Sequence, residues 1–273
     1  MPETESAVRV AVTGALGRMG ALLASRVIAE EGLTLVGATE RHDHPQIAKD
    51  VGRLLGLEPC EVSLENDLRN AVISAQVIID FTQPESALRS AQIAAEFGIA
   101  LVLGTTGFSD KQRDELYSLI RSVPCVHAPN FAVGVNLMLK LVERTARTLG
   151  PDWDVEIVEA HHRQKRDAPS GTALALARAA ACGQDSLPED VVQYGRPRGE
   201  ALRAAGEIGV HAVRAGQITG EHTVLFAGPN ETLRIEHCAQ SRELFVDGAL
   251  LAARWLIGRD PGVYSMFDVL ELY

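Results

Sequence analysis

The sequence has fewer basic than acidic residues: 26 Lys and Arg accompany 36 Asp and Glu, which leaves a net charge of −10 over 273 residues. An acidic chain is a poor general binder of nucleic acid or other polyanions, so any anion must be held by a local arrangement of groups. The remaining composition, 46% hydrophobic and 23% charged, is that of a globular protein and excludes a disordered or low-complexity chain.

Cysteines are also scarce: four thiols, at Cys60, Cys125, Cys182 and Cys238, are far apart and form no CxxC pair. This spacing favours isolated thiols over a disulfide or zinc framework and is typical of a reducing compartment. No apolar run approaches the roughly 18 residues that span a bilayer, and the polar residues 1–7 do not resemble a signal peptide. We therefore expect a cytoplasmic protein with no membrane or nucleic-acid partner.

The amino-terminal half alternates β-branched runs with helical patterns. Strands are predicted at residues 8–13, 33–39, 77–82 and 99–103, and helices at 21–31 and 84–97, with a further helix behind a capping box at Ser109 and Gln112. Strands joined by crossover helices indicate a doubly wound parallel sheet, and therefore an α/β fold.

The pattern changes after about residue 130. Helices are predicted at 134–149, 172–181 and 245–257, and strands at 154–160, 207–214, 222–227, 232–238 and 267–272. The turn at 228–231 indicates an antiparallel hairpin, and strands with few crossovers indicate a separate α+β domain. The sequence thus predicts one domain from residues 1–130 and 241–273, with residues 131–240 inserted as a second domain.

A glycine-rich turn at 14–20, GALGRMG, directly follows the first predicted strand and opens a helix. Its GxxGxxG spacing is a variant of the dinucleotide fingerprint, in which glycines allow the backbone to approach a pyrophosphate. The helix start adds free N–H groups and about half a positive charge. The alternative is a glycine-rich turn without a ligand.

An acidic residue at the expected distance supports the dinucleotide interpretation. Glu40 lies 20 residues beyond Gly20, at the end of the second predicted strand, where a carboxylate can accept hydrogen bonds from adenosine ribose hydroxyls. Arg41 could pair with a 2′-phosphate, so NAD is supported and NADP is not excluded. The loop 104–107, GTTG, follows another strand at the same sheet edge and either lines the nicotinamide end or is a plain turn.

The segment 159–172, EAHHRQKRDAPSGT, concentrates five cationic or potentially cationic side chains within six residues, 161–166. Hydroxyl and N–H groups of Ser170, Gly171 and Thr172 follow at a helix start, an arrangement that suits a carboxylate or phosphate. His161 and His162 can titrate near neutral pH and donate a proton, and Lys165 can pair with a carboxylate or act as an acid. The alternative is a solvated basic loop in which Ser170 merely caps a helix.

Other sites are not expected from the remaining residues. The chain has no HExxH motif and no cysteine at ligand spacing beside these histidines, so no metal site is predicted. Taken singly, the other histidines are expected to be structural or surface residues; they are His42, His44, His127, His211, His222 and His237.

Together, the segments 10–20 and 159–173 resemble the two signatures of the 4-hydroxy-tetrahydrodipicolinate reductase (dihydrodipicolinate reductase) family of lysine and diaminopimelate biosynthesis. The resemblance extends over essentially the whole chain, through GTTG at 104–107, APNFAVGVN at 128–136, GEHT at 220–223 and DVL at 268–270. It implies a Rossmann-type dinucleotide-binding domain built from both chain ends. It also implies that the central domain binds the substrate and forms a homotetramer.

The resemblance further implies residue roles for NADH or NADPH and for a cyclic imine with two carboxylates. The pyrophosphate would be held by Gly14, Ala15, Leu16, Gly17, Arg18 and Met19, the ribose by Glu40 and the 2′-phosphate by Arg41. The nicotinamide would be bordered by Gly104, Thr105, Thr106, Ala128, Pro129, Asn130 and Phe131. His161 and Lys165 would be catalytic, and the substrate would be bound by His162, Lys165, Ser170, Gly171 and Thr172.

Two other functions fit parts of the sequence. A non-catalytic NAD(P)H-sensing regulator would share the glycine turn, but it has no evident need for the segment 161–172. Homoserine and aspartate dehydrogenases could share the fold, but they lack the paired histidines and the KRDAPSGT run at 165–172.

Overall fold

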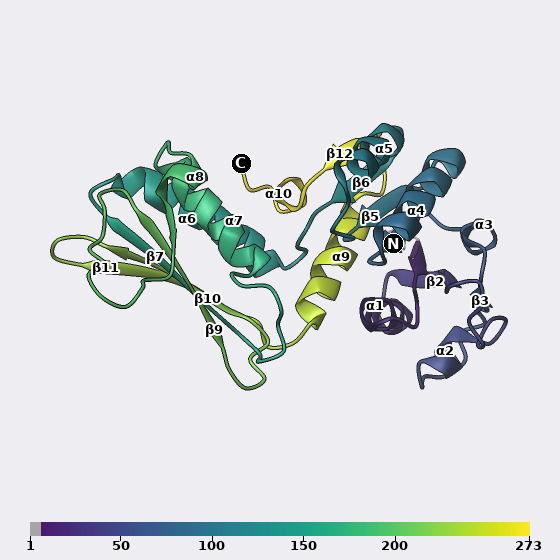
Figure 1. The fold of residues 1–273 in the computed structure, drawn as a ribbon. Coiled ribbons are helices and arrows are strands. Elements are labelled where there is room, and N and C mark those ends of the chain that lie inside the picture. The colour runs from purple at the N-terminus through teal and green to yellow at the C-terminus, as the bar shows by residue number, and fades with distance from the viewer. Residues whose placement is uncertain (1–6) are drawn as a thin grey trace, which may run out of the picture. The chain divides into compact units, whose positions relative to one another are not determined.

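The computed structural model describes residues 7–273 (Figure 1). Residues 1–6, which belong to the polar start that does not resemble a signal peptide, lie outside the described residues. Two compact units are present. Unit 1 comprises the chain up to Phe131 together with Phe245–Glu271, and unit 2 comprises Ala132–Leu244. Each unit has its own sheet.

Unit 1 contains a seven-stranded sheet in which every strand pair is parallel, with the order β12-β6-β5-β4-β1-β2-β3. The strands are β1 (Val8–Thr13), β2 (Leu33–Thr39), β3 (Leu64–Glu65), β4 (Val77–Asp80), β5 (Ala100–Leu103), β6 (Pro124–His127) and β12 (Gly262–Tyr264). The strand order reverses at β1, between β2 and β4. In doubly wound sheets, ligands bind beside the carboxyl ends of the strands at this switch point.

Helices cover both faces of this sheet. They are α1 (Arg18–Ala29), α2 (Val51–Leu54), α3 (Leu68–Ala71), α4 (Pro84–Phe97), α5 (Asp110–Ile120), α9 (Glu243–Trp255) and α10 (Met266–Val269). Side chains alternate between two cores: Val10 and Val12 pack with α1 and α9, whereas Ala11 packs with α4 and α5. Because helices cover both faces of the sheet, the sequences of its strands are nearly continuous apolar runs. The predicted α/β class with a doubly wound parallel sheet is confirmed.

Unit 2 combines a five-stranded mixed sheet, ordered β11-β10-β7-β9-β8, with helices on one face (Figure 1). Its elements are α6 (Val133–Leu149), β7 (Asp154–His161), α7 (Gly171–Gly183), α8 (Pro188–Val191), β8 (Val192–Tyr194), β9 (Ile208–Arg214), β10 (Glu221–Ala227) and β11 (Thr232–Cys238). The antiparallel hairpin predicted around residues 228–231 is confirmed by the pairing of β10 with β11. Gly183 allows α6 and α7 to pack closely, since a Cβ there would lie 2.3 Å from the Glu143 carbonyl oxygen.

The alternation of β7 is central to the site described below. Val155, Ile157, Glu159 and His161 are buried on one face of the strand, whereas the side chains between them are half-buried or exposed. The two titratable residues therefore continue the same stripe as the apolar core of unit 2.

The carboxyl-terminal segment differs from expectation. The strand predicted at residues 267–272 is wrong: the chain forms helix α10 there, and the last strand is β12. Ser265 and Asp268 form a capping box that starts the helix, because Ser265 Oγ accepts from the Phe267 and Asp268 backbone N–H groups. The period of the hydrophobic residues does not distinguish a helix from a strand in such a short apolar run, so the capping box decides its conformation.

Candidate functional site

The glycine turn links β1 to α1 at the switch point of the sheet. Gly14 has a φ of +61°, and a Cβ on Gly20 would lie 1.9 Å from the Gly14 carbonyl oxygen, so both positions need glycine. The helix begins behind Gly17, and within the described chain no side chain caps it. Its first backbone N–H groups are therefore directed at the space in front of the turn, as in phosphate sites.

Glu40 connects the end of β2 to this turn. Its Oε1 accepts from the Leu16 backbone N–H at 3.0 Å, and its Oε2 accepts from the Arg41 backbone N–H at 3.1 Å. The Arg41 side chain is 72% exposed and contacts Asp43, with 3.3 Å between Nε and Oδ1. The carboxylate is thus fixed beside the turn, while the guanidinium projects from the same edge.

A cavity of about 770 Å³ lies in unit 1 along the carboxyl ends of β1, β2 and β4. Of the residues predicted for the cofactor, those that line it are Gly14, Gly17, Arg18, Met19, Glu40 and Arg41. Ala15 is instead fully buried and Leu16 packs against the core, so they shape the turn from behind. The cavity lining, the uncapped helix start and the close-packed glycines fit a dinucleotide.

The remaining predicted cofactor residues do not line this cavity, but two of them, Gly104 and Phe131, lie beside Phe81 in its wall. A Cβ on Gly104 would lie 2.2 Å from the Phe81 ring, and the rings of Phe81 and Phe131 have centroids 5.1 Å apart. Thr105, Ala128 and Phe131 are buried, whereas Thr106 and Pro129 are exposed and Gly104 and Asn130 are half-buried.

Asp80, at the end of β4, has no role in the sequence-based prediction. Its side chain is fully buried and accepts hydrogen bonds from the hydroxyls of Thr82 at 2.7 Å, Ser90 at 2.6 Å and Thr105 at 3.0 Å. The carboxylate therefore fixes the loop after β5 to the end of β4. An Asp at the carboxyl end of a buried strand is the signal that could have found it.

In unit 2, the predicted proton donor His161 is held by a carboxylate. Its Nδ1 lies 2.6 Å from Oε2 of Glu159, which is fully buried. Arg214, from β9, makes a two-pronged contact with the same carboxylate, with both N–O distances at 2.8 Å. Burial opposes ionisation, but the hydrogen bonds from Arg214, His161 and the Ser170 backbone lower the pKa of Glu159 below its usual range.

Ser170 and His222 complete the inner side of this cluster. Ser170 Oγ accepts from the Ala173 backbone N–H at 3.1 Å and lies 3.1 Å from Nε2 of His222. Ser170 is 2% exposed and its side chain caps α7 from within, while its contact with substrate stays a prediction. Burial first, then the neighbouring His161, lowers the pKa of His222 to about 4. From the sequence alone, only a structural or surface role was expected for His222.

The outer side of the cluster is the basic loop. Lys165 is half-buried, and its Nζ lies 3.0 Å from Oδ2 of Asp167, while its backbone N–H donates to the His162 carbonyl at 3.1 Å. Gly171 is exposed and Thr172 half-buried at the start of α7. The loop and helix start thus contribute a cation, an imidazole and backbone N–H groups directly after the strand that ends at His161, which suits an anion that exchanges a proton.

Residues 7–273 contain neither a cluster of metal-binding side chains nor a membrane-spanning helix. No group of three or more His, Cys, Asp or Glu side chains in this range is arranged to hold a metal ion. No helix in the same range is both long enough and apolar enough to cross a membrane.

Comparison with known proteins identifies both units. Residues 8–131 match the family model for the amino terminus of dihydrodipicolinate reductase, and residues 134–270 match the model for its carboxyl terminus. A 4-hydroxy-tetrahydrodipicolinate reductase of Anaeromyxobacter dehalogenans is 47% identical over 97% of this chain and 98% of its own. One of Syntrophus aciditrophicus is 44% identical over 96% of this chain and 98% of its own.

A solved structure agrees. The dipicolinate-bound dihydrodipicolinate reductase from Paenisporosarcina sp. TG-14 superposes with a TM-score of 0.77 at 27% identity, over 96% of this chain and 98% of that one. An amine dehydrogenase from Mycobacterium smegmatis, with a TM-score of 0.59 at 15% identity over 96% of this chain and 95% of its own, shares the fold alone. With both family models matched along the chain, the protein belongs to the dihydrodipicolinate reductase family.

Proposed function

We propose that the chain catalyses the NAD(P)H-dependent reduction of 4-hydroxy-tetrahydrodipicolinate to tetrahydrodipicolinate, a step of lysine and diaminopimelate biosynthesis. Family membership supports this reaction. The observation that carries it is the buried Glu159–His161 pair beneath a basic loop and a helix start, in a chain whose other unit carries a dinucleotide cradle.

Unit 1 is the dinucleotide-binding domain in this proposal. The turn from Gly14 to Met19 holds the pyrophosphate, Glu40 the adenine ribose and Arg41 the 2′-phosphate of NADPH. The nicotinamide is bordered by Gly104, Thr105, Thr106, Ala128, Pro129, Asn130 and Phe131. When bound, the cofactor supplies a hydride. The exposed Arg41 and the fixed Glu40 are compatible with use of both NADH and NADPH.

Unit 2 is the substrate-binding domain. A cyclic imine with two carboxylates suits the loop at 161–166 and the N–H groups at the start of α7. His162, Lys165, Gly171 and Thr172 bind its carboxylates, and Ser170 supports this helix start from its buried position. The relative from Paenisporosarcina, described as dipicolinate-bound, carries a ligand of the same dicarboxylate class.

Proton transfer is the task of His161 and Lys165. The substrate first loses water and becomes a conjugated ring. Addition of hydride then increases the negative charge on the side of the ring nitrogen, and a proton donor must neutralise this charge. Both side chains can donate this proton, while the anchored carboxylates hold the ring in a fixed orientation.

The direct test is to mix the protein with NADPH or NADH and the product of the preceding aldol step, and to follow the nicotinamide absorbance. Substrate-dependent loss of absorbance supports the proposal. Binding of NADPH without its oxidation would instead indicate a sensor.

The assembly and location form part of the same proposal. Unit 2 forms the contacts of a homotetramer in the cytoplasm. Light scattering should then give a mass four times the 29.4 kDa of one chain. A mass equal to one chain at micromolar concentration would contradict the tetramer and leave the reaction untouched.

A further inference from the structure

Glu159 is a carboxylate that the substrate cannot reach, yet it contacts the proposed proton donor. It is 0% exposed, and each of its oxygens accepts two hydrogen bonds. Oε1 accepts from the Ser170 N–H at 2.9 Å and Arg214 Nη2 at 2.8 Å, and Oε2 accepts from His161 Nδ1 at 2.6 Å and Arg214 Nη1 at 2.8 Å. An ionised carboxylate can only accept, so the proton of this contact lies on Nδ1 of His161.

Fixing the proton on Nδ1 determines what the other ring nitrogen can do. In a neutral imidazole whose Nδ1 carries the proton, Nε2 is the acceptor, and in the protonated ring it is a donor. Nε2 faces Gly220, where an added Cβ would lie 3.0 Å away. Glycine at this position leaves space beside the nitrogen that must exchange the proton.

A second histidine restrains the ring without adding charge. The rings of His161 and His222 meet edge to face, with centroids 5.2 Å apart and an interplanar angle of 75°. Because burial keeps the pKa of His222 at about 4, His222 is neutral near pH 7 and does not repel a protonated His161. The plane of the His161 ring is thus restrained by a carboxylate on one side and an aromatic edge on another.

Arg214 keeps Glu159 in this orientation. Besides its two contacts to the carboxylate, Nη2 donates to the Asp167 carbonyl at 2.6 Å, which ties the basic loop to β9. Two-pronged Arg–carboxylate contacts fix orientation as well as charge. The guanidinium also offsets the negative charge of Glu159, so the pair is suited to orienting His161 rather than to carrying its proton away.

We propose that Glu159, locked by Arg214, is a positioning residue that holds the His161 proton on Nδ1 and leaves Nε2 to exchange protons with the substrate. This deepens the proposed reductase function and rests on it. The closest analogy in chemical terms is an acid that orients a catalytic histidine from behind. Glu159 itself touches neither substrate nor cofactor in this account.

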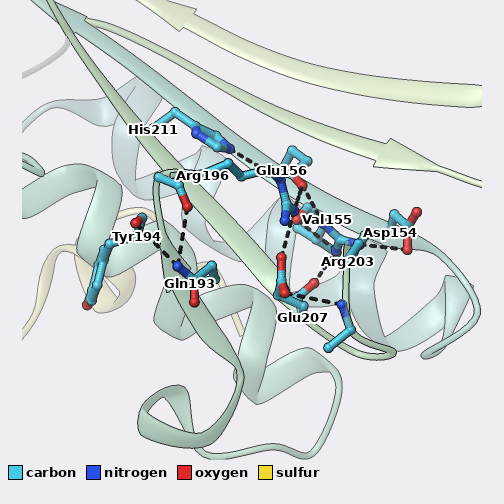
Figure 2. A network of polar contacts seen from close by, with 11 residues as sticks. Asp154, Val155, Glu156, Gln193, Tyr194, Arg196, Arg203, Glu207 and His211 are labelled. Carbon is cyan, nitrogen blue, oxygen red and sulfur yellow. Dashed lines mark hydrogen bonds and ion pairs between the residues drawn. The ribbon is translucent and has the colours of Figure 1, made fainter. Parts of the chain in front are cut away.

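The same strand offers a matched control. Glu156 lies on the opposite face of β7 and also accepts hydrogen bonds from a histidine and arginines: His211 Nε2 at 2.7 Å, Arg196 Nη2 at 2.7 Å, and Arg203 (Figure 2). Replacing either Glu by Gln removes one charge from a comparable ion-pair cluster. Only Glu159 contacts a residue of the proposed site.

The test compares Glu159→Gln with Glu156→Gln. A carboxamide has one acceptor oxygen and an NH2 group that can only donate, so Glu159→Gln leaves two of the four donors around this side chain without an acceptor. We expect kcat to fall about 10- to 1000-fold in Glu159→Gln, while KM for the imine and the Kd for NADPH change less than about threefold. In Glu156→Gln, kcat should stay within about twofold of wild type.

Proton NMR supplies a readout that a merely structural role would not move. The wild type should show a downfield Nδ1–H resonance that disappears in His161→Asn, disappears or moves upfield in Glu159→Gln, and persists in Glu156→Gln. If Glu159→Gln does not fold, Arg214→Lys, which keeps the charge but loses the two-pronged contact, takes its place with a smaller loss of kcat. An unchanged kcat, or an unchanged resonance in the folded variant, overturns the proposal.

The two readouts separate this proposal from the reductase function. If wild type binds NADPH but reduces no imine, the proposed reaction fails, and the resonance alone then decides whether Glu159 positions His161. If wild type is active but both variants match it, the reaction stands and the positioning role fails.

Discussion

Asp80 and Thr105 are joined by a hydrogen bond of 3.0 Å between two buried side chains, 25 positions apart in the chain. The bond fastens the loop after β5, proposed to border the nicotinamide, to the end of β4. Asp80 also accepts from Thr82 and Ser90, so one buried carboxylate organises two loops at the ligand edge of the sheet. Buried carboxylates persist only when hydrogen bonds replace their hydration.

Removal of this carboxylate should destabilise unit 1 and weaken cofactor binding. In Asp80→Ala, buried hydroxyls lose their acceptor, and we expect the free energy of unfolding to fall by about 3 kcal/mol. Asp110→Ala, at an exposed position of α5 with a 3.5 Å ion pair to Arg113, should change it by less than about 0.5 kcal/mol. Urea unfolding and NADPH titration measure the two effects. A loss no greater than that of Asp110→Ala would show that Asp80 does not hold the loops.

Arg41 should decide between the two cofactors. Its exposed guanidinium lies at the edge where the 2′-phosphate is proposed to bind. Arg41→Ala should raise KM for NADPH by about 10- to 100-fold, because a charge-assisted contact is lost, and leave KM for NADH within about threefold. Steady-state kinetics with both cofactors measure this. Equal changes for NADH and NADPH would remove Arg41 from phosphate recognition.

Lys165 should affect both binding and turnover. Its Nζ is held 3.0 Å from Asp167 within the basic loop. Lys165→Ala should raise KM for the imine and lower kcat by at least about tenfold, because the residue is proposed both to anchor a carboxylate and to donate a proton. Arg166→Ala removes an equal charge from the exposed neighbouring position and should change kcat far less. A rise in KM alone would make Lys165 an anchor only.

His222 should make the protein sensitive to acid. Its pKa is about 4 in the folded protein, against about 6.5 for an unperturbed histidine. As the pH falls below 6.5, the unfolded chain therefore takes up a proton that the native protein does not, and stability is lost until the pH approaches 4.

The size of this effect follows from the same two pKa values. Between pH 6.5 and 5, wild type should lose about 1.5 kcal/mol more than His222→Gln. Burial also lowers the pKa values of His127 and His237, but these residues remain in both proteins, so their contributions cancel in the comparison. Urea unfolding at each pH gives the difference, and parallel pH curves would contradict it.

The glycine turn and the sheet could be predicted because their signals are local. Glycines between a strand and a helix, and an acid 20 residues later, mark the edge of the sheet in the sequence itself. The carboxyl-terminal helix α10 could not be distinguished from a strand in this way, since a short apolar run fits both periods and the capping box at Ser265 decides the conformation.

The support around His161 could not be predicted in the same way. Glu159 meets Ser170 and Arg214, which are 11 and 55 positions away, and such contacts exist only once β7 and β9 pair. The two-residue spacing of Glu159 and His161 is the one local signal available, because it corresponds to one face of a strand, but the predicted strand ended at residue 160. His222 carries no local signal of its burial beside that pair.

The most direct test of the account is a single-turnover reaction of NADPH-loaded protein with the freshly formed imine, in wild type and His161→Ala. We expect both proteins to bind NADPH equally and wild type to oxidise one nicotinamide for each imine reduced. His161→Ala should react about 100- to 10,000-fold more slowly. Equal rates in the two proteins would contradict the assignment of His161, and a wild type that leaves the nicotinamide reduced would contradict the account as a whole.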